Sequence, residues 1–530
     1  MTGHVAVVGG GLAGITAALC CADAGYSVRL FESRPWLGGL THSFPRGGLW
    51  VDNGQHVFLR CCARYLALLD RLGMRDSVYL QPRLDIPVSG GGHEGRLRRL
   101  PLPAPLHLSR ALLGYPWLSH GARLRFVRAA LALRGVDVAD PRTDTVGFGE
   151  WLRAHGQRRD AIDSLWDLVG IATLNARADD VSLALAATVF QIGLLTDSGA
   201  ADIGWSRIPL RQLHGDAGHA ALDAAGVPVT HEKVTAIRRE TTGWTVATSD
   251  GECTVDAVVS AVPPAAAQTL LPTGAVDLPA NWAEALGNSP IVNIHVVYDR
   301  TVMREPLRAG VGSVVQWVFD RTDTAGPGTV PQHATGAAAR TSAAAAPTGI
   351  AAPTSDTPST GTAAPNGYTP STGTAAFTDQ APTTGCSPEP PGTTRVGGQY
   401  LAVSVSAADD FIDRPVADLR REFLPALEQL LPAARAARVI DFFVTRERHA
   451  TFRPAPGSAR LRPPAATALP GLALAGAWTA TGWPATMEGA VRSGESAAAE
   501  VISYLAGERS RSGASAATLQ PRTRISEVLG

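Results

Sequence analysis

The sequence predicts an α/β fold in which one domain is split into several pieces along the chain and a mixed α+β domain is inserted between them. Strand-like and helix-like segments alternate at the N-terminus, more strands follow at 227–262, and a strand, a turn and a helix lie at 472–505. The stretches 106–133 and 148–195 are mostly helical in pattern. Such alternation is typical of a parallel sheet covered by helices.

Composition limits the class of protein. The chain has 530 residues, of which 45% are hydrophobic and 18% charged, which is typical of a globular protein. Basic and acidic residues number 47 each, so no global positive field attracts nucleic acid and we expect no such partner. The longest nearly uncharged apolar run, 181–195, is too short to span a bilayer. A strand begins at His4, leaving no room for a signal region, so we predict a cytoplasmic protein.

A segment of low complexity interrupts the predicted second domain. Residues 322–398 are almost all Ala, Thr, Pro, Gly and Ser, and one octet occurs there twice. A segment that buries so little apolar surface is expected to be disordered. Strand-like runs flank it at 313–319 and 399–405, which indicates a hairpin whose turn was enlarged. The tail, 507–530, is Ser-, Arg- and Ala-rich and is also expected to be loose.

A glycine motif follows the first predicted strand, 5–8. Gly9 permits the tight turn, Gly11 lets the backbone approach a pyrophosphate, and Gly14 lets the next helix pack on the strand. Glu32 ends the second strand, where a carboxylate accepts a bond from a ribose hydroxyl. The motif predicts a Rossmann-like dinucleotide site and does not by itself separate NAD from FAD.

The segments around this motif narrow the cofactor. The run 32–39, with Arg34 and a double glycine, resembles the continuation found in FAD-containing amine oxidases and carotenoid-type desaturases. The runs 474–478 and 482–490 resemble the strand and helix start that close on the flavin in that superfamily. The resemblance implies FAD as cofactor, with a helix N-terminus at the flavin N1/O2 edge and Pro484 in its first turn. One departure is Ala477, where the superfamily commonly has an acid.

Four further segments, 51–57, 174–175, 316–321 and 478–489, together resemble the squalene-associated flavoprotein family, the hydroxysqualene dehydroxylases. Membership would imply reductive removal of the hydroxyl of hydroxysqualene, giving squalene for hopanoid or related triterpene synthesis, with reduced FAD as the hydride source. A separate, unidentified reductant would have to recharge the flavin.

The resemblance assigns site residues. For FAD these are Gly9, Gly11, Leu12, Ala13, Gly14, Glu32, Arg34, Gly38, Gly39, Gly54, Gln55, Val234, Gly476 and Met487. Asp52 and His56 are the candidate proton donors, with the alternatives that Asp52 only holds the loop and that His56 only hydrogen-bonds the backbone. Trp478 and Trp483 are candidates either for the wall of an apolar channel or for ordinary core. Asn175 is a candidate for a polar cavity residue, a helix cap or a surface residue. No Cys or His spacing typical of a metal site occurs.

The domain order that follows has eight parts. They are 1–90 (FAD-binding, first part), 91–205 (helical, facing substrate or membrane), 206–275 (FAD-binding, second part), 276–321 and 399–445 (substrate-domain strands), 322–398 (insertion), 446–506 (FAD-binding, third part) and 507–530 (tail).

A C30 isoprenoid substrate also implies peripheral docking on the inner face of the cell membrane. Seven arginines (Arg96, Arg98, Arg99, Arg110, Arg123, Arg125 and Arg128) alternate with Leu102, Leu106, Leu112, Leu113, Tyr115, Trp117, Leu118 and Phe126. Basic and apolar residues mixed at helical spacing can seat a helix on an anionic surface, or can form an ordinary solvated amphipathic helix.

Three alternatives stay open on the same scaffold. A carotenoid-type desaturase or an amine oxidase would remove hydride from its substrate instead of donating it. A prenyl-lipid carrier would bind an isoprenoid without flavin chemistry.

Overall fold

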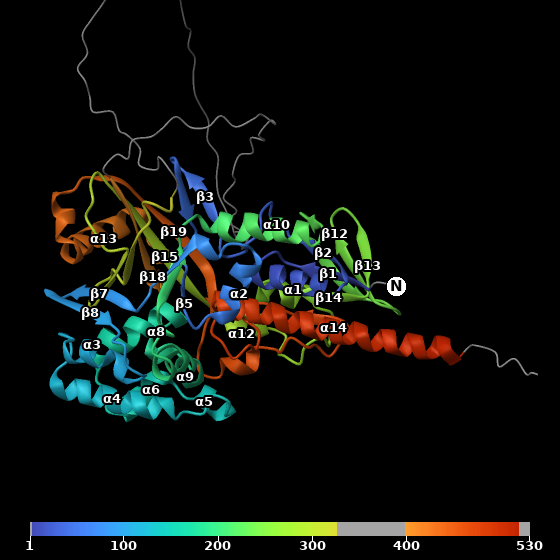
Figure 1. The fold of residues 1–530 in the computed structure, drawn as a ribbon, viewed down its shortest axis with the longest axis horizontal. Coiled ribbons are helices and arrows are strands. Elements are labelled where there is room, and N and C mark those ends of the chain that lie inside the picture. The colour runs from blue at the N-terminus through green and yellow to red at the C-terminus, as the bar shows by residue number, and fades with distance from the viewer. Residues whose placement is uncertain (1–2, 326–397, 519–530) are drawn as a thin grey trace, which may run out of the picture. The chain divides into compact units, whose positions relative to one another are not determined.

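The computed structural model describes residues 3–325 and 398–518, and its central element is a five-stranded parallel sheet (Figure 1). The strand order is β10-β2-β1-β14-β20. The strands are β1 (His4–Val8), β2 (Ser27–Phe31), β10 (Val229–Thr230), β14 (Ala257–Ser260) and β20 (Leu472–Leu474). Every neighbouring pair is parallel. The sheet therefore gathers strands that lie far apart in the sequence, as a split dinucleotide-binding domain requires.

Both faces of this sheet are covered. On one face α1 (Leu12–Asp23), α10 (Ala217–Ala224) and α14 (Met487–Thr518) pack over Val5, Val7 and Val259. On the other, the antiparallel strands β11 (Val234–Arg239), β12 (Trp244–Thr248) and β13 (Glu252–Val255) pack over Ala6, Val8 and Val258. Alternate residues of each strand enter opposite cores, which explains the continuous apolar run of the first strand.

A second, seven-stranded sheet has the order β19-β15-β18-β17-β16-β7-β8. Its strands are β7 (Asp85–Gly90), β8 (His93–Arg98), β15 (Asn288–Tyr298), β16 (Leu307–Gly310), β17 (Trp317–Asp320), β18 (Gln399–Ser406) and β19 (Val439–Phe452). Helix α13 (Val416–Leu430) packs on one face through Leu419, Phe423 and Leu427. The other face contributes residues to the cavity described below.

The predicted hairpin around the insertion is confirmed at its base. Strands β17 and β18 pair antiparallel, with Trp317 opposite Ser404 and Asp320 opposite Leu401. The first strand begins at Trp317, later than the predicted start at residue 313. The expectation that 322–398 is disordered is wrong for residues 322–325, where Ala325 is buried and its carbonyl accepts from the Trp50 amide at 2.9 Å. Residues 326–397 lie outside the described residues.

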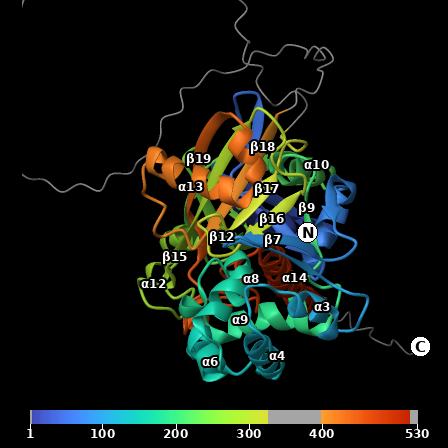
Figure 2. The same cartoon turned by 90° about the vertical axis from the view of Figure 1, so that its left-hand side faces the viewer.

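Helices gather on one side of the second sheet (Figure 2). They are η2 (Leu106–Leu108), α3 (Ser109–Leu113), α4 (His120–Arg134), α5 (Pro141–Thr145), α6 (Phe148–Ala154), α7 (Arg159–Ala161), η3 (Ile162–Trp166), α8 (Asp167–Leu174), α9 (Leu183–Phe190) and η5 (Gln191–Thr196). Trp166, Phe148 and Phe190 form the centre of their core. The smaller elements are α2 (Ala63–Arg71), α11 (Pro264–Leu270), α12 (Trp282–Leu286), β3 (Ser43–Arg46), β4 (Leu49–Asp52), β5 (Val57–Leu59), β6 (Val78–Leu80) and β9 (Ile203–Ser206).

Three predicted boundaries are wrong. The limits at residues 90 and 445 assign β7 and the end of β19 to the FAD-binding pieces, whereas both strands belong to the seven-stranded sheet. The expectation of a loose tail fails as far as Thr518, because α14 continues to that residue. No proline follows until Pro521, and extending an existing helix costs little. Across the described residues, no helix combines the length and the apolar character needed to cross a bilayer.

Candidate functional site

The glycine turn after β1 leaves space that a phosphate can fill. Gly9 has φ +110°, a conformation that favours glycine. A Cβ at Gly14 would lie 1.8 Å from the Gly9 carbonyl oxygen, so α1 can approach the strand only with glycine there. At Gly11, by contrast, the nearest atom to a built Cβ is the Gly39 Cα at 3.8 Å. The backbone at Gly11 therefore faces open space at the N-terminus of α1, where anions bind.

Glu32 lies at the end of β2 beside this turn. Its Oε2 accepts a hydrogen bond from the Gly10 amide at 2.8 Å, and its Oε1 accepts one from the Arg34 amide at 2.8 Å. The carboxylate is thus held at the edge of the turn, with acceptor capacity left for a ribose hydroxyl.

One continuous cavity of about 1280 Å³ runs from this turn to the helices. The predicted FAD residues that line it are Gly9, Gly11, Leu12, Ala13, Glu32, Arg34, Gly38, Gly39, Gly54, Gln55, Val234, Gly476 and Met487. Gly14 does not line it, because its contribution is the close packing of α1 on β1. The far end is mostly apolar, with Leu112, Phe126, Val127, Trp166, Val169 and Ile192 among its walls.

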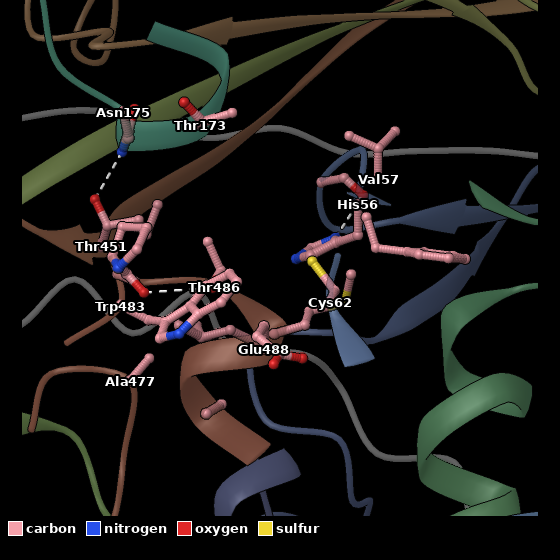
Figure 3. A pocket seen from close by; sticks show the side chains of 18 of the residues that line it. His56, Val57, Cys62, Thr173, Asn175, Thr451, Ala477, Trp483, Thr486 and Glu488 are labelled. Carbon is pink, nitrogen blue, oxygen red and sulfur yellow. Dashed lines mark hydrogen bonds between the residues drawn. The ribbon is translucent and has the colours of Figure 1, made fainter. Parts of the chain in front are cut away.

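The C-terminal segment closes on the cavity as predicted, but its helix starts later. Helix α14 begins at Met487 and is capped by Thr486, whose Oγ1 accepts from the Gly489 amide at 3.1 Å. Pro484 therefore precedes the helix and is not in its first turn. Figure 3 shows Ala477, Trp483, Thr486 and Glu488 on this side of the pocket.

Glu488 is a lining residue that the sequence reasoning missed. Its side chain is buried, and its carboxylate accepts from the Tyr65 amide at 2.8 Å and from Arg492 Nε at 2.7 Å. It joins α14 to the start of α2. A glutamate directly after the predicted helix start was the available signal, because acids favour the first turn of a helix.

The residues present fit a flavin. The Gln55 Nε2 is buried, lines the cavity, and has no hydrogen-bond partner in the part of the chain that the structure describes. A buried donor without a partner is costly unless a ligand supplies the acceptor. Together with the open backbone at Gly11 and the fixed carboxylate of Glu32, it forms a site with donors at Gln55 and Gly11 and an acceptor at Glu32. Ala477 also lines the cavity and offers only its backbone there for polar contact.

His56 lies in the cavity wall opposite Asn175 and Thr451 (Figure 3). Its Nδ1 donates to the Gly54 carbonyl oxygen at 3.0 Å, so in the neutral ring the Nε2 carries the lone pair. Burial lowers the pKa of His56 and favours this neutral form. Its proposed role as proton donor stays a prediction.

Asp52 is not brought to the cavity. Its Oδ2 accepts from Arg321 Nη2 at 2.6 Å, and its Oδ1 accepts from Ser43 Oγ at 2.6 Å and from the Leu210 amide at 3.1 Å. Neither Asp52 nor Arg321 lines the cavity. The geometry corrects the expectation that Asp52 can donate a proton to substrate and indicates that it holds the loop that carries Gly54 and His56.

Asn175 combines two of the roles considered for it. It ends α8 with φ +53° and lines the cavity. Its Nδ2 donates to the Ser289 carbonyl at 2.9 Å and to Thr451 Oγ1 at 3.0 Å, and its Oδ1 accepts from the Ala407 amide at 2.7 Å. It therefore ties the helical region to the seven-stranded sheet.

The two candidate wall tryptophans both line the cavity. Trp478 stacks on Trp282 with ring centroids 5.1 Å apart, and Arg492 lies over the Trp483 ring at 4.7 Å. Both rings are held in place by these contacts, as a channel wall requires.

The predicted basic surface is smaller than expected. Arg96 and Arg98 pair with Asp85, and Arg99 pairs with Asp202. Tyr115 and Leu118 are buried. The spacing of the arginines along the sequence could not show that Arg99 is paired, because its partner Asp202 lies 103 residues away.

The sequence matches the family described as flavin containing amine oxidoreductase over residues 12–349 and 363–502. The chain belongs to this family. It is an FAD-dependent oxidoreductase, with an α/β fold whose dinucleotide-binding part is the parallel sheet described above.

Curated relatives of two kinds match. Hydroxysqualene dehydroxylase from Rhodopseudomonas palustris is 26% identical over 95% of this chain and 99% of its own. Zeta-carotene desaturase from Zea mays is 32% identical over 36% of this chain. The match spans only 35% of the length of that desaturase. Among solved structures, cyclohexylamine oxidase from Brevibacterium oxydans superposes with a TM-score of 0.62 at 17% identity over 96% of this chain and 100% of its own.

Proposed function

We propose that this flavoenzyme removes the hydroxyl group of hydroxysqualene reductively and releases squalene. The observation that carries the proposal is the similarity to hydroxysqualene dehydroxylases over nearly the whole chain. The sequence identity to one of them is 26% over 95% of this chain. The shared length includes the strands and helices that wall the apolar end of the cavity, whereas the carotene desaturases match over about a third of the chain.

The cavity supports a long isoprenoid substrate. Its volume of about 1280 Å³ exceeds the ~300–1,000 Å³ typical of a small-molecule site, so a flavin leaves room for a second ligand. The walls beyond the flavin are aliphatic and aromatic, which suits a hydrocarbon chain and excludes water around the reacting carbon.

When bound, reduced FAD supplies the hydride. The residues of the protein orient the cofactor and confine the substrate. The Gly54–Gln55 loop and the N-terminus of α14 orient the cofactor, and Trp478 and Trp483 confine the substrate chain. The hydroxyl is allylic, so protonation of its oxygen gives water and a delocalised carbocation that hydride can quench.

The test is anaerobic incubation of the chemically reduced holoprotein with hydroxysqualene, followed by extraction and mass spectrometry for squalene. Protein stripped of FAD is the control. We expect squalene from the reduced holoprotein alone. Absence of squalene with FAD demonstrably bound overturns the proposal, and a more unsaturated product from the oxidised protein would identify a desaturase instead.

We also propose that the protein docks peripherally on the inner face of the cell membrane, where such a substrate resides. Large apolar side chains are exposed just before η2, at Leu102, and on η2, α3 and α4, at Leu106, Leu113, Leu124, Val127 and Leu131. Leu106, Val127 and Leu131 also line the cavity, so the exposed surface continues into its wall. Arg110 and Arg128 are exposed on the same helices, which favours anionic lipid headgroups.

Flotation with vesicles that contain an anionic lipid tests this docking. Leu113 and Leu124 are 69% and 64% exposed, and the double substitution Leu113→Glu/Leu124→Glu should weaken vesicle binding by about tenfold or more. Val416→Glu, at an exposed residue of α13, is the matched control. Equal flotation of the wild type and the double variant would contradict the docking proposal.

A further inference from the structure

The wall formed by the seven-stranded sheet carries a carboxyl group that the site described so far does not use. Four carboxylate side chains line the cavity within the described residues: Glu32, Glu232, Glu447 and Glu488. Glu32 and Glu488 are bound by backbone amides, and Glu232 accepts from Thr248. Glu447 alone has no hydrogen bond or ion pair to residues 3–325 or 398–518.

The strand pairing fixes the side to which Glu447 points. In the ladder between β15 and β19, Ile291 lies opposite Glu447 and Asn293 lies opposite Thr445. Ile291 and Asn293 line the cavity, as does Glu447. The arginines on either side of Glu447 face away from the cavity. Arg446 donates to the Arg414 carbonyl, and Arg448 pairs with Asp413. Glu447 therefore faces the cavity, in the last regular pair of the ladder before its irregularity between Ser289 and Ile291.

Asn293 lies beside Glu447 with a free acceptor. Its side chain is fully buried, its Nδ2 donates to the Asn53 carbonyl at 3.2 Å, and its Oδ1 has no partner among the residues described. Diagonal neighbours on adjacent strands have side chains about 7–8 Å apart, a gap that a glutamate can span. A half-buried carboxyl group and a buried, unpartnered amide oxygen thus lie on the same wall of the cavity, which also carries Ser404, Ser406 and Thr451.

The pair also adjoins the loop expected to meet the flavin. The Asn53 carbonyl accepts from both Asn293 and Thr445, and the next residue is Gly54. A Cβ at Gly54 would lie 3.7 Å from Asn293 Nδ2 and 3.4 Å from His56 Cε1. Thr451, farther along the same strand, is visible on this wall in Figure 3.

We propose that Glu447 is the catalytic residue that protonates the leaving hydroxyl and that Asn293 positions this hydroxyl. This assignment rests on the proposed dehydroxylation. The Glu447 carboxyl gives its proton to the hydroxyl oxygen, and the hydroxyl's own hydrogen is donated to Asn293 Oδ1. The carbon–oxygen bond breaks and water leaves. Reduced FAD, when bound, would supply the hydride, and with it the two electrons, for the new carbon–hydrogen bond. Glu447 then regains a proton from water.

Two measurements on the FAD-loaded protein test the assignment. The first is binding of hydroxysqualene and of squalene to the oxidised protein, in which no reduction can occur, followed through the flavin absorbance. The wild type should prefer the alcohol, and Glu447→Leu should lose about fivefold or more of that preference. Glu447→Gln should keep most of it, because an amide still hydrogen-bonds the hydroxyl.

The second measurement is the single-turnover rate of squalene formation by the reduced protein. Glu447→Gln should lower this rate about 100-fold or more, since an amide cannot serve as the acid, and Glu447→Asp should recover part of the loss. Asp413→Asn, which removes a surface carboxylate behind the same strand, is the control and should leave the rate unchanged.

The outcomes separate the two proposals. Squalene formation by the wild type with an unchanged rate in Glu447→Gln and an unchanged preference in Glu447→Leu overturns the role of Glu447 and leaves the function intact. No squalene, but an alcohol preference that depends on Glu447, overturns the function and supports the hydroxyl site. No squalene and no alcohol preference overturn both.

Discussion

The substitution Asp52→Asn should destabilise the folded protein, because it leaves the Arg321 guanidinium buried without its counter-ion. The two side chains are only 6% and 9% exposed, and their N–O distance is 2.6 Å. Removing one partner of a buried ion pair costs about 3–5 kcal/mol. An asparagine Oδ1 can still accept from Ser43 and from the Leu210 amide, which places the expected loss at the lower end, about 3 kcal/mol.

Urea unfolding followed by tryptophan fluorescence, with FAD content measured in parallel, checks this value. The double substitution Asp52→Asn/Arg321→Met should recover most of the stability, since replacing both members of such a pair is often nearly neutral. A single variant that unfolds at the wild-type urea concentration, holds FAD normally and yet loses turnover would refute the reasoning. Asp52 would then act on the substrate, as the sequence first suggested.

Two further predictions concern other buried polar groups. Asn175→Ala removes three hydrogen bonds, two to strands of the seven-stranded sheet and one to Ala407 just after β18, and should cost about 3 kcal/mol. Asn175→Gly should cost about 1 kcal/mol less, because φ at this position is +53°. Urea midpoints of the two variants check this order, and equal midpoints would contradict it. Burial lowers the pKa values of His214 and His295 to about 3, so both stay neutral in the folded protein while the unfolded chain takes up protons below about pH 6.5. The free energy of unfolding should therefore fall by about 1.4 kcal/mol per pH unit for each histidine as the pH drops below 6.5, and urea titrations at pH 7.5 and 5.5 should show a smaller fall in the His295→Asn variant.

The nucleotide end of the site could be predicted because its requirements are local. Gly9, Gly11 and Gly14 are required by the backbone geometry of a single turn. Glu32 follows at a fixed position at the end of the next strand. The chemistry of such a turn is contained in about 25 consecutive residues. The hairpin around the insertion was predictable for a similar reason, since strand patterns survive on both sides of it.

The catalytic end could not be predicted, because its contacts join distant parts of the chain. Asp52 stands in a loop that matches the family pattern, and only the fold shows that Arg321, 269 residues away, neutralises it. Arg99 belongs to an apparent basic surface until Asp202 is placed beside it. Charge partners at such separations leave no local pattern, so sequence reasoning overcounts free arginines and free acids.

Glu447 illustrates a signal that was present and difficult to interpret. It lies in the charged run 446–449, which by composition predicts a solvent-exposed strand. Thr445 and Glu447 alternate with Arg446 and Arg448, and this period of two indicates that the strand has two different faces. The sequence cannot say which face is inward, because both carry polar groups. The pairing of Glu447 with Ile291 decides it.

That placement bears on the choice between the two enzyme classes that share this scaffold. An enzyme that removes hydride from an unactivated hydrocarbon has no leaving group to protonate, so it gains nothing from a free carboxyl in its apolar wall. An enzyme that expels a hydroxyl needs a proton at the departing oxygen and a polar group to locate it. Keeping the Oδ1 of Asn293 buried without a partner carries an energetic cost that a pure hydrocarbon site would have no reason to bear. The pair therefore favours an oxygen-bearing substrate over a carotenoid, independently of any relative's activity.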